Sequence, residues 1–208
     1  MSDPTAPRGL RRPLGRMLRL AEAGHEAPQR PELEAFVQAA FKRRHDANVT
    51  SFMPTLLSFR DTVGRLRGVV GLREAERSPL YLEQYLERPV EAAIAAASGL
   101  GVQRLKVVEI GNLAGANCRA AVRMVALLPA YLLSLDYQWI VFTATSSIRS
   151  ILQGFGAPLV ELARADGSRI SGGQDQWGRY YEADPRVFAG YLPNSRRLPG
   201  FSAVAHVR

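Results

Sequence analysis

Apolar positions along the chain repeat with two spacings, one typical of helices and one typical of strands. Helical spacing predicts helices over 31–44, 116–133 and 146–154, and a helical stretch over 177–183. The segment 81–98 is helical in composition, but Pro89 breaks a continuous hydrogen-bond ladder and predicts two separate pieces.

Short β-rich runs lie between these helices. They cover residues 48–60, 67–73, 104–110, 138–145, 159–163 and 187–192. The first two flank a turn at Gly64 and predict an antiparallel hairpin, with Pro54 at an edge or before the strand proper. Gly111 and Gly115 interrupt the pattern after the third run and predict a loop. The central order is strand, glycine loop, helix, strand, helix, strand, which predicts an α/β protein.

Composition fits one globular domain. The chain has 208 residues, of which 47% are hydrophobic and 22% charged, and this excludes a disordered chain. No run reaches the ~18 apolar residues of a membrane span. One cysteine excludes an internal disulfide framework, and three scattered histidines argue against structural zinc, so we expect no metal site. We divide the chain into a leader (1–30), a folded domain (31–195) and a C-terminal tail (196–208).

The net charge is +8, and arginines gather in the leader. No apolar stretch of signal-peptide length follows them, so we expect a cytoplasmic protein with a flexible, solvated arm. Leu10, Leu14, Met17 and Leu18 leave open a short basic amphipathic helix in peripheral contact with anionic lipid or a partner. Charge alone suggests nucleic acid, but basic and aromatic residues do not alternate, so we expect no nucleic-acid partner.

The junction between the strand over 104–110 and the following helix is the first candidate site. Amides at a helix N-terminus favour an anionic ligand, such as the phosphates of a nucleotide, coenzyme A or phosphopantetheine. The loop lacks both the Lys-Ser/Thr ending of a Walker loop and a full G-x-G-x-x-G motif.

Glu109 interrupts an otherwise apolar strand. Burying an unpaired carboxylate is costly, so its side chain must face solvent, a partner or a site. In a cleft, desolvation would raise its pKa and make it a general base; on a wet face it would pair with Lys106.

Other candidates have competing interpretations. Thr143, Thr145, Ser146 and Ser147 follow the next strand, and they either cap a helix or bind an amide-bearing arm such as pantetheine. Cys118 begins a helix, but no histidine neighbours it in the sequence, so we expect a buried, inert thiol. His45 and Asp46 have catalytic residue types, yet adjacent residues do not face each other. Tyr180 either supplies a phenol acid or packs in the core.

Several segments together resemble the bacterial thermostable hemolysin family, from about residue 35 to residue 192. They are HDANVTSFMPTLLSF (45–59), LYLEQYLERPVEAAI (80–94), VVEIGNLAG (107–115), WIVFTAT (139–145) and QWGRYYEADPRVFAG (176–190). The family looks like a branch of the GNAT-type acyltransferases, near the acyl-homoserine-lactone synthases. The resemblance implies an α/β, GNAT-like acyltransferase fold, with a central mixed sheet flanked by helices, and makes 31–195 a catalytic domain.

The resemblance also implies roles for single residues. The GNAT phosphate loop has Gln or Arg first, a central Gly, and Gly or Ala last, and only Gly115 is kept here. The lactone synthases carry Glu-x-Ser/Thr-Arg-Phe/Leu, of which Glu109 and Leu113 remain and the arginine is missing. We therefore expect Glu109 to be the base or amine-orienting group, with Asn112 as its catalytic neighbour. The expected cofactor-binding residues are Gly111, Gly115, Ala116, Asn117, Thr143 and Thr145, and the expected substrate-binding residues are His45, Asp46, Phe52 and Tyr180.

The implied function is N-acyl transfer from an acyl thioester to a small amine, giving a product that is itself membrane-active. We expect acyl carrier protein as partner in preference to coenzyme A, steered by Arg119, Arg123 and Arg149. The acyl-phosphopantetheine thioester is then a co-substrate, with no tightly bound cofactor. The alternative is a non-catalytic, membrane-active or lipid-binding hemolysin-like protein.

Overall fold

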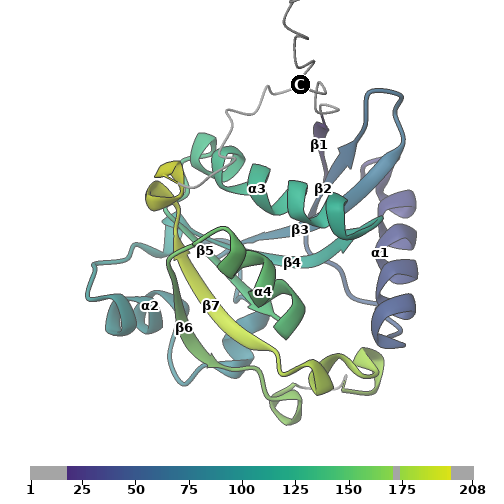
Figure 1. The fold of residues 1–208 in the computed structure, drawn as a ribbon. Coiled ribbons are helices and arrows are strands. Elements are labelled where there is room, and N and C mark those ends of the chain that lie inside the picture. Colours follow the sequence, from purple (N-terminus) through teal and green to yellow (C-terminus); the bar gives the residue numbers. More distant parts are fainter. Residues whose placement is uncertain (1–17, 171–173, 198–208) are drawn as a thin grey trace, which may run out of the picture.

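The computed structural model describes residues 18–170 and 174–197 (Figure 1). Its strands are β1 (Arg19–Ala23), β2 (Thr55–Arg60), β3 (Leu66–Glu74), β4 (Val107–Gly115), β5 (Trp139–Ala144), β6 (Leu159–Arg164) and β7 (Arg186–Tyr191). They form one sheet in the order β1-β2-β3-β4-β5-β7-β6. β4 and β5 are parallel and every other described pair is antiparallel, so the sheet is mixed, as predicted.

Helices cover both faces of the sheet. They are α1 (Arg30–His45), α2 (Val90–Ser98), α3 (Cys118–Ser134) and α4 (Ser146–Gly154). Figure 1 shows α3 and α4 across one face, with α1 and α2 at opposite ends of the molecule. Among the described helices, none combines the length and apolar character needed to cross a membrane.

Alternation along the strands sorts side chains between two apolar layers. Leu57, Val70 and Val108 pack in the cluster that includes α3, whereas their neighbours Leu56, Val69 and Val107 face the other side. There, Leu56 and Val69 pack with α1, and Val107 packs with α2. Because strand side chains alternate between faces, Glu109 shares the Val107 side, next to α2 and its preceding turn.

The predicted loop at 111–115 is wrong, because β4 continues to Gly115. Gly71 pairs with Gly111, but Val69 pairs with Ala114, so β4 holds one more residue than β3 across this interval. Asn112 has a left-handed backbone (φ 48°) inside this bulge. A bulge keeps the strand in the sheet while it bends, whereas the glycines in the sequence also suit a loop.

β4 and β5 pair over only four residues each, from Val107 with Trp139 to Ile110 with Phe142. Beyond them β4 stays with β3, and β5 stays with β7. The parallel strands therefore part at Ile110, at the bulge, and their separation opens the sheet there.

The sheet begins within the segment 1–30 that the sequence assigns to a leader. Residues 19–23 form β1, which pairs with β2 and buries Leu20 and Ala23. The alternation in RLAEA is too short to stand out beside the arginines before it. The predicted amphipathic segment up to residue 17 and the tail from residue 198 lie outside the described residues.

Of the remaining predictions, the hairpin is confirmed, but two predicted helical segments are 3-10 turns. The hairpin is confirmed as β2 and β3, with Pro54 directly before β2. Pro89 separates a 3-10 turn, η1 (Tyr81–Tyr85), from α2, so the first predicted piece is 3-10 and not α-helical. The predicted helical stretch at 177–183 is two 3-10 turns, η4 (Gln174–Trp177) and η5 (Tyr180–Ala183). Gly178, at φ +51°, separates them.

Candidate active site

The parting of β4 and β5 lies at a cavity of about 670 Å³. Residues of both sheet faces line it, together with residues of α1, α3, α4 and η4. Most of its wall is apolar, and polar groups gather near Glu109. The cavity therefore has an apolar arm and a polar end.

The apolar arm lies between the parted strands and the helices α3 and α4. Its lining residues include Val125, Leu128, Pro129, Ile140, Phe142, Ile148, Ile151, Leu152, Phe155 and Leu159. No described charged side chain of α3 or α4 lines the cavity. Such a wall suits a hydrocarbon chain, whose transfer out of water contributes about 0.8 kcal/mol for each CH₂ group.

Glu109 lies at the polar end and is 2% exposed. Its carboxylate accepts hydrogen bonds from the backbone amides of Tyr81 (2.7 Å) and Leu82 (3.0 Å) in η1. Burial raises its pKa to about 7, and the two amides and Arg73 oppose that rise. A carboxylate that titrates near neutrality can take a proton and return it at physiological pH.

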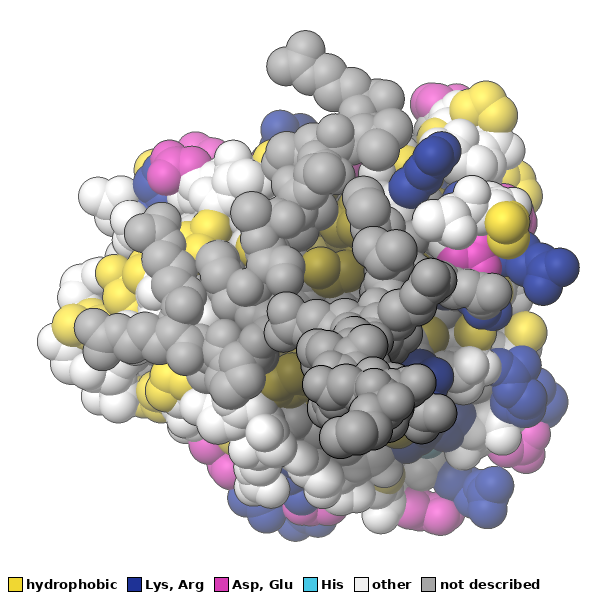
Figure 2. All heavy atoms as spheres, turned by 45° about the horizontal axis from the view of Figure 1, so that its top comes forward, with side chains coloured by type: hydrophobic (Ala, Val, Ile, Leu, Met, Phe, Trp, Pro, Cys, Tyr) yellow, Lys and Arg dark blue, Asp and Glu magenta, His cyan; other side chains and the backbone are white. Residues whose placement is uncertain are grey.

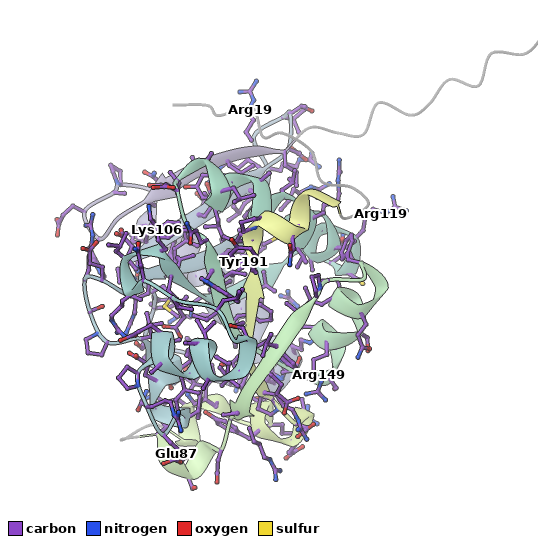
Figure 3. All side chains as sticks on the ribbon, turned by 90° about the vertical axis from the view of Figure 1, so that its left-hand side faces the viewer. Arg19, Glu87, Lys106, Arg119, Arg149 and Tyr191 are labelled. Carbon is purple, nitrogen blue, oxygen red and sulfur yellow. The ribbon has the colours of Figure 1, made fainter. Side chains whose placement is uncertain are left out.

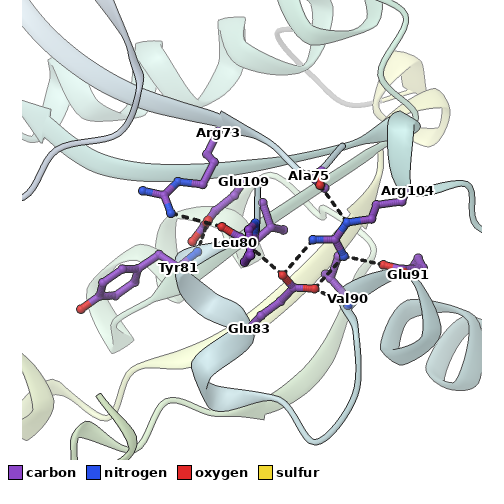
Figure 4. A network of polar contacts seen from close by, with 10 residues as sticks. Arg73, Ala75, Leu80, Tyr81, Glu83, Val90, Glu91, Arg104 and Glu109 are labelled. Carbon is purple, nitrogen blue, oxygen red and sulfur yellow. Dashed lines mark hydrogen bonds and ion pairs between the residues drawn. The ribbon is translucent and has the colours of Figure 1, made fainter. Parts of the chain in front are cut away.

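A second carboxylate, that of Glu83, belongs to η1, the turn whose amides bind Glu109 (Figure 4). It accepts hydrogen bonds from the amides of Leu80 (2.8 Å) and Val90 (2.9 Å) and forms a two-pronged ion pair with Arg104 (2.7 and 2.9 Å). Arg104 also binds Glu91 and the carbonyl of Ala75. Burial raises the pKa of Glu83, but these hydrogen bonds outweigh it and hold the pKa below its ordinary value.

Aromatic rings line the polar end on the side of α1. The His45 ring lies edge-on to Tyr180 (5.2 Å between centroids), and Trp177 contacts Phe41, Tyr81 and Tyr180. Burial lowers the pKa of His45, and Arg44 and Arg179 lower it further, so the imidazole is neutral at pH 7. Burial likewise raises the pKa of Tyr81 and of Tyr180, which keeps both phenols protonated.

Gly178 makes this ring cluster possible. A Cβ at Gly178 would lie 2.4 Å from the carbonyl oxygen of His45 and 2.7 Å from that of Asp46. The amide of Arg179 donates to the same His45 carbonyl (2.7 Å). Glycine therefore lets the 174–180 segment touch the end of α1, and this contact brings Tyr180 to His45 and the cavity.

Asn112 lines the cavity, but its side chain already has a partner. Its Oδ1 accepts the amide of Met53 (2.8 Å), and Arg30 binds the carbonyls of Met53 and Pro54. The Met53 side chain lies over Gly111, where a Cβ would approach Met53 Cε to 2.3 Å. Asn112 and Gly111 thus contact Met53, which lines the cavity, and the catalytic role of Asn112 stays a prediction.

The junction with α3 also lines the cavity, at Gly115, Ala116, Asn117 and Cys118. The Ala116 amide donates to the carbonyl of Arg67 (2.9 Å), and the Asn117 side chain caps α3 at the Ala120 amide (2.9 Å). Cys118 is exposed, contrary to the predicted buried thiol. α3 starts shortly after the end of β4, and its first residues, Cys118 and Arg119, are exposed.

Thr143 and Thr145 line the cavity where β5 ends. Thr145 occupies the N-cap position of α4, ahead of the serines that the sequence favours as caps, and its side chain makes no capping hydrogen bond. Phe52 also lines the cavity, from the 47–54 segment. Thr143, Thr145 and Phe52 are therefore placed at the cavity, and their roles stay predictions.

Three residues considered in the sequence analysis have other partners. Asp46 does not line the cavity; it is exposed and pairs with Lys42 (2.6 Å), because the left-handed end of α1 turns it outward. The guanidinium of Arg149 donates to the carboxylate and to the backbone carbonyl of Asp184. Lys106, considered as a partner for Glu109, pairs with Asp136.

Basic side chains are distributed over more than one face. Figure 2 shows Lys and Arg along the side on which α1 lies, with acidic side chains among them. The last turn of α1 contributes Lys42, Arg43 and Arg44, all exposed. Figure 3 shows Arg119 and Arg149 on the same side of the molecule, on α3 and α4. Among the described residues, no group of three or more His, Cys, Asp or Glu side chains is arranged to hold a metal.

Three further residues at the polar end were not singled out from the sequence: Arg73, Tyr81 and Tyr85. Arg73 lies directly opposite Glu109 in the β3–β4 register. The run RGVVGLR predicts its strand, but the pairing with Glu109 depends on the bulge, which the sequence does not reveal.

Comparisons with known proteins bear on the family and on the fold. The model of the thermostable hemolysin family matches residues 23–196. No curated protein sequence matches the chain. Solved structures do match, though at low sequence identity.

The crystal structure of the AHL synthase LasI has a TM-score of 0.56 at 11% identity and covers 86% of this chain and 91% of its own. FeeM, an N-acyl amino acid synthase from uncultured soil microbes, has a TM-score of 0.56 at 13% identity, covering 86% and 94%. MesI, a CoA-dependent acyl-homoserine lactone synthase, has a TM-score of 0.51 at 15% identity, covering 86% and 94%. The predicted acyltransferase fold is confirmed.

Proposed function

The chain belongs to the thermostable hemolysin family, and we propose that it is an N-acyltransferase that moves a fatty acyl group from a thioester to a small amine. The observation that carries the proposal is Glu109, a buried carboxylate with a pKa of about 7 at the end of a largely apolar cavity. An apolar arm and a neutral-pH base in one cavity are what acyl transfer to an amine needs. LasI is an AHL synthase and FeeM an N-acyl amino acid synthase, and these activities support the same class.

In the proposed reaction the acyl chain occupies the apolar arm, and the thioester carbonyl lies where β4 and β5 part. The amine nitrogen attacks the carbonyl carbon and forms the C–N bond, while Glu109 takes a proton from the nitrogen. The C–S bond then breaks, and the thiolate leaves with that proton. Backbone amides near Gly111 and Asn112 polarise the carbonyl oxygen.

The donor arm enters past Thr143, Thr145 and the first turn of α3, which all line the cavity. We propose acyl carrier protein as the donor, because Arg119 is exposed beside this entrance and an acidic carrier is attracted to basic surface. Coenzyme A carries the same phosphopantetheine arm, and MesI is described as CoA-dependent, so both donors belong in the test. We place the reaction in the cytoplasm, where both donors occur.

The test is intact-mass spectrometry of the purified protein with acylated carrier proteins, acyl-coenzyme A thioesters and a panel of amines. We expect one donor to lose its acyl group while an acylated amine of matching mass appears. Donor loss without an acylated amine would indicate a thioesterase. No donor loss with any amine would refute the proposed activity.

The apolar arm makes its own prediction about chain length. Val125→Phe adds a ring to the cavity wall, so we expect turnover of long acyl chains to fall about tenfold while short chains are little affected. Val122→Phe is the matched control, because Val122 lies on the same helix but does not line the cavity. Equal losses for long and short chains in Val125→Phe would place the acyl group elsewhere.

A second candidate function is lipid binding without catalysis, because an apolar cavity retains a fatty acid whether or not Glu109 acts. This alternative predicts a bound fatty acid, no donor turnover, and vesicle binding that falls with salt and is lost on deleting residues 1–17. The same mass spectra separate the two functions.

A further inference from the structure

Arg73 holds an unused hydrogen-bond donor at the polar end of the cavity. Its Nη1 donates to the carbonyl of Pro79 (3.2 Å), but its Nε is buried and has no partner in the structure. A buried donor without an acceptor costs about 1–3 kcal/mol, so its position calls for a ligand atom.

Arg73 and Glu109 lie opposite each other on neighbouring strands, and Figure 4 shows their side chains converging beside η1. Arg73 lowers the pKa of Glu109, although no ion pair joins these two described side chains. The carboxylate has its own donors in the amides of Tyr81 and Leu82. A cationic donor and a basic acceptor therefore stand side by side, each able to bind a different group of one ligand.

Resting on the proposed acyltransfer, we propose that the acceptor is an α-amino acid, with its amine at Glu109 and its carboxylate on the guanidinium of Arg73. An α-amino acid carries its anionic and nucleophilic groups one carbon apart, which matches two directly opposed strand residues. A guanidinium binds a carboxylate with two parallel N–H donors, and the free Nε is one of them.

The phosphate of the donor does not compete for this site. In a phosphopantetheine thioester the phosphate is separated from the reacting carbonyl by the whole pantetheine arm. An anion beside the base Glu109 therefore belongs to the acceptor. Arg43 and Arg44, which also line the cavity, lie on the exposed end of α1 and are not the partners of a group held at Glu109.

The wall beyond this pair restricts the acceptor's side chain. Among the described lining residues Glu109 is the sole acidic one, and its neighbours are the rings of Tyr81, Tyr85, Trp177 and Tyr180. A lysine or arginine side chain would find no anionic partner there. The preferred amino acid is one with an uncharged aromatic or aliphatic side chain.

The test compares L-phenylalanine with phenethylamine, the same molecule without its carboxylate, as acceptors for the same acyl donor. We expect the wild type to favour phenylalanine about 10- to 100-fold in kcat/KM, the loss typical of one charge-assisted hydrogen-bond pair. Arg73→Met should reduce this preference to about threefold or less. The change of this ratio between wild type and Arg73→Met is free of the difference in basicity between the two amines, and of any effect of the lost charge on Glu109 that acts equally on both.

Two variants control for a structural role of Arg73. Arg73→Lys keeps the charge but not the guanidinium fork, and should retain part of the preference. Arg104→Met removes a neighbouring arginine that holds η1 but does not line the cavity. It should lower both acceptors equally and leave their ratio at the wild-type value.

Each outcome decides between the claims. A wild type that acylates both amines equally, or an Arg73→Met variant that keeps the full preference, overturns the amino-acid acceptor while leaving the acyltransferase intact. A reduced ratio in Arg104→Met as well would make the effect structural and also overturn it. Absence of acyl transfer to any amine refutes the proposed function and the acceptor together.

Discussion

Glu83 lies on the 3-10 turn η1, and Glu109, on β4, accepts hydrogen bonds from the amides of that turn, but the two carboxylates differ in what else surrounds them. Each accepts two backbone amides: Glu109 those of Tyr81 and Leu82, and Glu83 those of Leu80 and Val90. Glu83 also has the full fork of Arg104, and its pKa is lowered. Glu109 has no ion pair in the described structure and is more deeply buried, and its pKa rises to about 7.

Two similar carboxylates therefore have opposite pKa shifts because their surroundings in the fold differ. Backbone amides alone do not offset the loss of water around Glu109, whereas a bidentate guanidinium does so for Glu83. The Arg104–Glu83 region fixes η1, and η1 in turn presents the amides that hold Glu109. One carboxylate therefore stabilises the turn that positions the other for chemistry.

Glu109→Gln is the change with the largest expected effect. Glutamine keeps an oxygen for the η1 amides but cannot take a proton, so we expect turnover to fall about 10²- to 10⁴-fold with the fold intact. The measurement is the acyl-transfer rate by mass spectrometry, with circular dichroism as the check on folding.

Glu83→Gln is its matched control. We expect a lower melting temperature and a turnover within about tenfold of the wild type. If Glu83→Gln abolishes turnover while Glu109→Gln does not, the two roles have been assigned the wrong way round.

The second prediction concerns stability and pH. In the unfolded chain Glu109 titrates near 4.5, and in the folded protein near 7, so the folded state binds the proton more tightly. Stability therefore falls as the pH rises from 4.5 to 7, by about 3 kcal/mol for this group. Denaturant unfolding should show the free energy of unfolding of Glu109→Gln rising relative to that of the wild type between pH 4.5 and 7. Above pH 7 the difference should stay constant.

The contribution of Glu83 to stability depends on pH in the opposite direction. Its folded pKa is lowered, so its contribution is fully present above about 4.5 and is lost as the pH falls through the lowered value. The penalty of Glu83→Gln should then shrink in acid. A pH-independent difference for both variants would mean that neither group's pKa is displaced by folding.

Of the substitutions Glu109→Gln, Glu83→Gln and Arg104→Met, we expect Arg104→Met to have the smallest effect. It leaves Glu83 half-buried without its cation, which should cost roughly 1–3 kcal/mol of unfolding free energy, since partial exposure screens the loss. Pairing it with Glu83→Gln in a double-mutant cycle measures the coupling directly. If the losses of unfolding free energy in the two single variants add up in the double variant, the ion pair between Arg104 and Glu83 does not stabilise the turn.

Sequence patterns predicted the α/β class, the β2–β3 hairpin and the split at Pro89, and they singled out Glu109, which lines the cavity. These follow from local signals: residue periodicity, proline chemistry, and one charge in an apolar strand. Residue resemblance supplied the acyltransferase fold, which periodicity alone does not specify.

What the sequence did not reveal depends on long-range register. The bulge at Asn112 looks like a loop until β3 pairs along it, and that pairing is what sets Arg73 opposite Glu109. Asp46 is predicted at the site beside His45, but the left-handed turn after α1 sends it to Lys42 instead. Contacts such as Gly178 against His45 join residues more than 130 positions apart, beyond the reach of local patterns.

Glu109, on β4, ionises near neutrality, while Glu83, on the turn η1 that holds it, stays ionised into acid. The direct measurement is a carboxyl ¹³C NMR titration of glutamate-labelled protein, with the two resonances assigned by their loss in Glu109→Gln and Glu83→Gln. We expect a midpoint near pH 7 for Glu109 and one below 4.5 for Glu83. A Glu109 midpoint at or below 4.5 would contradict it, because a carboxylate fully ionised throughout the neutral range is too weak a base for the proposed role.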